Sequence, residues 1–130
     1  MTRGTIRRDE QGAAVVEFAF ALPVVMMFIW GIFQLGLVFQ AQAGMQHALG
    51  EGARYATLYP TPTDLQIKNR VTASTFGTGN GTFDPPVLTT SSDLSSKTIS
   101  VTYKVTPNFL FISVPQISIT RSKKVYMPVL

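Results

Sequence analysis

The chain has 130 residues, which is enough for one small domain and a membrane anchor. It contains no cysteine, and this excludes disulfide bonds and thiolate metal ligands. The net charge is +4, but only 14% of the residues are charged and the basic ones are scattered, so the sequence predicts no nucleic-acid binding. A single histidine and the lack of paired carboxylates after residue 12 predict neither an enzyme nor a metal site or cofactor.

Residues 1–12 form a short basic leader. Arg3, Arg7 and Arg8 stand directly before an apolar stretch, and no lysine or arginine follows until Arg54. Positive charge on one flank of an apolar segment keeps that flank in the cytoplasm. The sequence therefore predicts a cytoplasmic N-terminus and places the C-terminal part on the other side of the membrane.

Residues 13–39 have the length and composition of a transmembrane helix. From Phe18 to Phe39 there are 22 residues without a charge. A helix of that length covers roughly 33 Å, which is enough to cross the core of a bilayer. One carboxylate, Glu17, stands at its start, where contact with lipid is costly. Pro23 lacks a backbone donor and predicts a kink in this helix.

The helix is predicted to continue over residues 40–59, until Pro60 ends it. Small residues recur at every fourth position of this extension, and they are Gly44, Ala48, Gly52 and Ala56. Residues four apart share one face of a helix, so this small-residue stripe lets another element approach closely. The element is either another helix or the head domain of the same chain. Another helix and the head can also pack on adjacent faces, because a second stripe runs beside the first. Its residues are Ala41, Met45, Leu49 and Ala53.

Residues 60–130 predict a small α+β head. Thr63 and Gln66 fit a capping box that opens a short helix reaching to about residue 75. Alternating apolar residues over 97–106 and 116–126 predict two antiparallel strands, and Val87–Leu88 add a possible third. The fold class is therefore α+β: a long N-terminal hydrophobic transmembrane helix with a head of an antiparallel β-hairpin or three-stranded sheet plus a short helix.

Two details of the head are open at this point. In the second strand, Ile117 and Ile119 are expected to face inward, and the slipped alternation at residues 121–124 indicates a bulge or an edge strand. Between the strands, bulky apolar residues stand between Pro107 and Pro115. They form either a plug in the core, which we favour, or an exposed tip that contacts lipid or a partner subunit.

The stretch Gly12-Ala-Ala-Val-Val-Glu-Phe-Ala-Phe-Ala-Leu-Pro23 resembles the processing region of type IV prepilins. The shared features are a basic leader that ends in glycine and an apolar run with glutamate at its fifth position and phenylalanine next. It resembles the TadE-like minor pseudopilins of the tight-adherence (Tad) pilus more closely than it resembles ordinary pilins. Glu51-Gly-Ala-Arg-Tyr-Ala56 is similar to the helix continuation of that family, so the resemblance covers residues 7–58.

The resemblance implies that a prepilin peptidase cuts between Gly12 and Ala13, so that Glu17 becomes the fifth residue of the mature chain. Its implied partners are this peptidase, other pilins or pseudopilins of the same system, the inner-membrane assembly platform and membrane lipid. The implied location is the bacterial inner membrane, with a cytoplasmic N-terminus and a periplasmic head, or an extracellular pilus. Ala13 departs from ordinary pilins, which most often carry an N-methylated phenylalanine there.

A role for Glu17 and the adjacent Phe18 in subunit register and assembly follows from this cut. The new amino group lies about one helical turn from Glu17. In a bundle of low dielectric constant, an amine and a carboxylate on neighbouring subunits neutralise one another and set the axial register. Alternatively, the Glu17 side chain extends to the lipid headgroups.

Three functions fit the sequence. The first, which we favour, is a minor pseudopilin required for assembly of a Tad (Flp-type) adhesion pilus. The second is an uncleaved single-pass, signal-anchored membrane protein with a small periplasmic binding head. The third is a major pilin, but Tad major pilins are much shorter and nearly headless, so the head favours the minor role.

Overall fold

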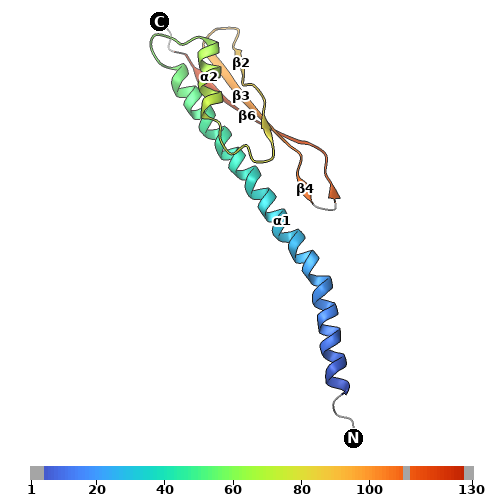
Figure 1. Ribbon diagram of the computed structural model, residues 1–130. Coiled ribbons are helices and arrows are strands. Elements are labelled where there is room, and N and C mark those ends of the chain that lie inside the picture. Colours follow the sequence, from blue (N-terminus) through green and yellow to red (C-terminus); the bar gives the residue numbers. More distant parts are fainter. Residues whose placement is uncertain (1–4, 110–111, 128–130) are drawn as a thin grey trace.

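The computed structural model describes residues 5–109 and 112–127. One long helix, α1 (Thr5–Ala56), carries a small head at its C-terminal end, and its first turns lie far from the head (Figure 1). The head contains α2 (Asp64–Ser74) and the strands β1 (Thr82–Phe83), β2 (Val87–Thr90), β3 (Ser96–Val105), β4 (Asn108–Phe109), β5 (Ile112–Ser113) and β6 (Ile117–Tyr126). The predicted α+β class is confirmed.

Strand β3 is the centre of the main sheet. It pairs with β6 along one edge, and β1 and β2 share its other edge, all antiparallel. The β3–β6 register runs without interruption from Ser96 opposite Tyr126 to Val105 opposite Ile117. The predicted bulge at residues 121–124 is therefore wrong, and the alternative of an edge strand is confirmed. On an edge strand, both faces of this stretch are exposed, so consecutive polar residues fit regular pairing.

The hydrophobic core lies between the sheet and the C-terminal half of α1. Ile99, Val101, Tyr103 and Val105 alternate on the buried face of β3, as predicted. They pack with Ile67 and Val71, the two buried residues of α2. Ile119 is half-buried against this core, but Ile117 is 42% exposed, so its predicted inward position is wrong. Ile117 is the first residue of an edge strand, and among the described residues β6 pairs with β3 alone.

Both ends of α1 differ from the prediction. The helix ends at Ala56 rather than at residue 59, because the amides of Thr57 and Leu58 bond to carbonyls only three residues back and form a turn. The residue directly before a proline disfavours the helical conformation, so the helix cannot continue up to Pro60. At the other end, α1 already begins at Thr5, so most of the predicted leader is helical.

The head divides α1 into two parts. Every residue from 12 to 30 is exposed and forms the free part, whereas buried residues appear from Gln34 onward in the docked part, residues 31–56. The docked part thus includes the last residues of the predicted transmembrane segment, residues 13–39, whose boundary stays a prediction. Within the described residues, α1 is the one helix long and apolar enough to cross a membrane.

Candidate functional site

The predicted cleavage site lies in the free part of α1. Gly12 and Ala13 are both exposed, and a side chain added at Gly12 would meet nothing within 4 Å. The peptide bond between them lies inside the helix, well after its start at Thr5. Glycine costs a helix interior about 1 kcal/mol relative to alanine, so local opening of the helix is favoured at Gly12.

Glu17 and Phe18 lie one turn further along, and both side chains are exposed, with Phe18 at 66%. The backbone nitrogen of Ala13 and the Glu17 position are separated by about 6 Å along the helix axis. Both groups are therefore open to a neighbouring subunit. The helix continues through Pro23 without a break, and the kink at that residue stays a prediction.

The small-residue stripe is covered by the head of the same chain. Its four residues, Gly44, Ala48, Gly52 and Ala56, are all buried. A Cβ atom at Gly44 would lie 2.0 Å from the carbonyl oxygen of Phe76, and one at Gly52 would lie 2.3 Å from a methyl carbon of Val71. The second stripe is also buried in the core. Of the two predicted occupants of these faces, the structure shows the head.

The glycine-rich loop after α2 closes this interface. Gly77 has φ +75°, and a Cβ atom there would lie 2.7 Å from the carbonyl oxygen of Gln40 on α1. Gly81 leaves space for the ring of Tyr103, whose hydroxyl donates a 2.7 Å hydrogen bond to the carbonyl oxygen of Thr78. These glycines serve close packing of the loop against α1 and the sheet.

The described residues between Pro107 and Pro115 are exposed or half-buried and lie outside the core, so for them the favoured core plug is wrong. Strands β4 and β5 form a separate two-stranded hairpin, which extends beside the middle of α1 (Figure 1). Ile112 is 62% exposed. The segment lies outside the core because α1 and α2 already cover the buried face of β3. Leu110 and Phe111, which the prediction included, lie outside the described residues.

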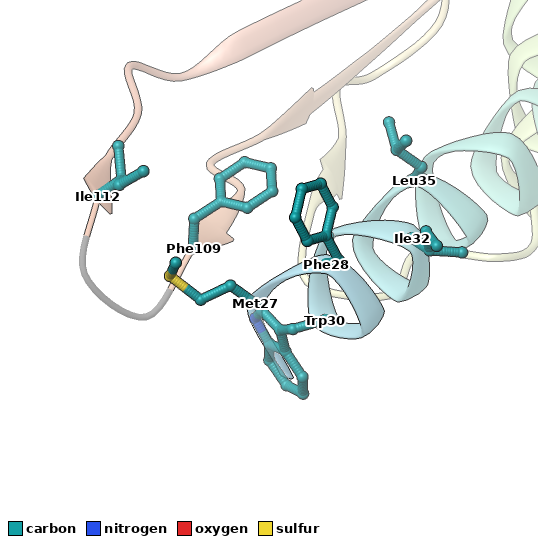
Figure 2. Close-up of a pocket in the computed structure, with 8 residues that line it drawn as sticks. Met27, Phe28, Trp30, Ile32, Leu35, Phe109 and Ile112 are labelled. Carbon is teal, nitrogen blue, oxygen red and sulfur yellow. The ribbon is translucent and has the colours of Figure 1, made fainter. Parts of the chain in front are cut away.

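A groove of about 400 Å³ separates the hairpin from α1. Met27 and Phe28 on α1 face Phe109 on β4 across it (Figure 2). Its remaining lining is also apolar, apart from the indole nitrogen of Trp30. That nitrogen donates a 2.6 Å hydrogen bond to the carbonyl oxygen of Asn108. Trp30 and Asn108 lie far apart in the sequence, so no local pattern predicts their contact. The run of apolar residues between two prolines was the sequence signal for the hairpin.

Charged side chains join the two helices on the other side of the head. Glu51 on α1 accepts from Arg70 of α2 at 2.7 Å and from Arg54 at 3.4 Å. The hydrogen bond from Arg70, and after it the one from Arg54, holds the pKa of Glu51 below its usual value. Lys97 of β3 pairs with Asp64 at the start of α2. In the part of the chain that the structure describes, no group of His, Asp and Glu side chains is placed to hold a metal ion.

The fold and the exposed N-terminal segment define a class of protein: a single apolar helix, suited to single-pass membrane anchoring, with a small α+β head docked on its far end. Residues 12–54 match the family model described as TadE-like protein. The match covers the free part and most of the docked part of α1 and confirms the predicted resemblance to this family. Comparisons with curated proteins and with solved structures give no match.

Proposed function

We propose that the chain is a minor pseudopilin required for assembly of a Tad pilus, and that a prepilin peptidase cleaves it after Gly12. The observation that carries the proposal is the free part of α1, which is exposed at every residue from 12 to 30 and begins with the glycine and glutamate of the processing pattern. Such a surface is apolar on all sides and is suited to lipid before assembly and to neighbouring helices afterwards.

Cleavage creates a charged partner for Glu17. Before the cut, the exposed Glu17 side chain is a charge at the edge of an apolar span. After the cut, the amino group of Ala13 supplies a positive charge at nearly the same height on each subunit. Pairing between subunits removes the cost of both charges in a low-dielectric bundle, and it does so at one axial offset only.

The head supports a minor rather than a major role. It rests on the docked part of α1 and buries the small-residue stripe and the second stripe there, which keeps those faces from other subunits. A subunit of this shape presents only its free part for packing of helices. We place it in the inner membrane, with the head in the periplasm, until assembly brings it to the pilus with the other pilins and the assembly platform.

The experiment that tests this function separates assembly from processing. Glu17→Gln removes the charge and keeps the shape, Glu17→Asp keeps the charge, and Glu51→Gln removes a charge from the docked part of the same helix. We expect Glu17→Gln cells to remove the leader normally and lose most filaments, while Glu51→Gln cells keep them. Normal filament yield in Glu17→Gln cells would contradict the register role.

A further inference from the structure

We propose that the β4–β5 hairpin dips into the outer interfacial layer of the bilayer that α1 spans, and that lipid acyl chains fill the groove between the hairpin and α1. The groove lies beside Met27–Leu35, so one of its walls is part of the apolar span itself (Figure 2). This membrane contact is independent of cleavage and of pilus assembly.

The length of α1 sets the depth of the hairpin. A bilayer core takes about 20 helical residues. Counted from Ala13, the outer boundary falls near Ile32, and counted from Phe18, the first residue of the uncharged run, it falls near Leu37. Phe109 lies against Gly31, at 3.5 Å from an added Cβ atom. Gly31 therefore lies about 1.5 Å inside the outer boundary on the first count and about 9 Å inside it on the second, at 1.5 Å per residue.

The composition of the hairpin fits this depth. Residues 105–120 contain no charged side chain, and the run is bounded by Lys104 and Arg121. Strand residues rise about 3.3 Å each, so Lys104 stands roughly 16 Å from Phe109 along the chain, which is suited to the headgroup region. Trp30 lies at the same level as the hairpin, and tryptophan is enriched at the interface of membrane and water.

Backbone hydrogen bonding limits how deep the hairpin can go. Strand edges without partners are too costly in the hydrocarbon core, where no water can satisfy them. The hairpin pairs Asn108 with Ser113 and Phe109 with Ile112, and Trp30 satisfies the Asn108 carbonyl oxygen. The remaining backbone groups need water, which the interfacial layer supplies. Amphipathic elements there bury about 5–10 Å into the boundary of headgroups and acyl chains.

Lipid fits the groove better than a second helix does. Helices that pack within membranes approach through small residues. The small-residue stripe of this chain is buried under its own head, whereas bulky side chains, Met27, Phe28 and Phe109 among them, wall the groove. Flexible acyl chains can follow such an irregular wall. The groove is also continuous with the exposed free part of α1, which is the surface that lipid covers.

The test uses the cysteine-free sequence. Ile112→Cys on the hairpin and Val87→Cys on β2 are matched, because both replace an exposed β-branched residue, at 62% and 58%. Each full-length variant carries a nitroxide spin label in vesicles of phosphatidylcholine and phosphatidylglycerol. We expect apolar oxygen to relax the label at 112 more than a water-soluble nickel complex does, and the reverse at 87.

Two results would overturn the proposal. A label at 112 that prefers the nickel complex, like the one at 87, would place the hairpin in water. A label at 112 that neither reagent reaches would assign the groove to a protein neighbour. A second measurement needs no substitution, because Trp30 is the single tryptophan. Lipids brominated near the headgroup should quench its fluorescence more than lipids brominated near the chain ends, and the opposite order would also overturn the proposal.

Discussion

The indole nitrogen of Trp30 donates a 2.6 Å hydrogen bond to the carbonyl oxygen of Asn108, which lies 78 residues further along the chain. This bond joins the apolar helix to the tip of the head, at the point where the free part of α1 ends. It fixes the level of the hairpin on the helix. The head is therefore held at this level of α1 by a specific contact as well as by its core.

Trp30→Phe should loosen the hairpin and leave the core intact. The substitution keeps an aromatic ring but removes the donor, and one hydrogen bond contributes about 1 kcal/mol, or roughly fivefold in a local opening equilibrium. Hydrogen exchange in micelles checks this. We expect faster exchange over residues 108–113 and unchanged exchange in β3. Unchanged exchange in the hairpin would show that the bond does not hold it.

Gly44→Ala should destabilise the docking of the head. The new methyl group would lie 2.0 Å from the Phe76 carbonyl oxygen, and overpacking of this kind costs about 1–3 kcal/mol. Gly50→Ala is the matched control, because nothing lies within 4 Å of its added Cβ atom and alanine favours the helix. Thermal unfolding in micelles should show a lower Tm for Gly44→Ala and an equal or higher one for Gly50→Ala. Equal Tm values for the two variants would contradict the docking.

The sequence predicted the elements that depend on local pattern. The capping box of Thr63 and Gln66 is present with both of its hydrogen bonds, and the alternation in β3 gave its buried face. The apolar run of α1 and the Gly12 to Pro23 pattern identified the helix and the family resemblance in the same way, because each is complete within a short stretch.

The features that depend on distant contacts could not be predicted. The occupant of the small-residue stripe was open, since a stripe of glycine and alanine fits any close neighbour. Whether the segment between Pro107 and Pro115 enters the core depends on the other elements that pack there. Residues of α1 and α2 already fill the core, so the segment lies outside it. Gln34 is 3% exposed, although it stands in the apolar span, and only the folded head explains its burial.

The turn between β2 and β3 should resist acid. Asp93 accepts hydrogen bonds from the Ser91 hydroxyl and from the Ser95 hydroxyl and amide, which lower its pKa from 3.8 to about 2. Because the folded pKa is depressed, this contribution to stability is present above pH 3.8 and is lost as the pH falls towards 2. Titration of the carboxyl carbon by NMR should give a midpoint near 2 in the native chain and a higher one in Ser91→Ala. A native midpoint near 3.8 would contradict these hydrogen bonds.

Arg70→Gln should weaken the link between α1 and α2 in a pH-dependent way. Arg70 is the main cause of the lowered pKa of Glu51, so its stabilising effect needs the charged carboxylate and disappears as the pH falls through that pKa. We expect a small loss in Tm at pH 7 that vanishes at low pH. Lys68→Gln removes the same charge from α2 at a residue that makes no ion pair among the described side chains, and it should change Tm little at either pH. A Tm difference for Arg70→Gln that persists unchanged in acid would contradict the pairing.

Processing at Gly12 is the step on which the proposed function depends. Gly12→Ala adds a side chain at the predicted cleavage site, whereas Gly36→Ala makes the same change at another exposed helical glycine with open space around it. We expect the first variant to accumulate uncleaved chain and the second to be processed normally.

The most direct measurement is the intact mass of the protein extracted from its native membrane. We predict a chain that begins at Ala13 and that keeps Met1–Gly12 when the prepilin peptidase is deleted. A chain that retains its leader in the presence of an active peptidase would contradict the account and support the alternative of an uncleaved, signal-anchored membrane protein.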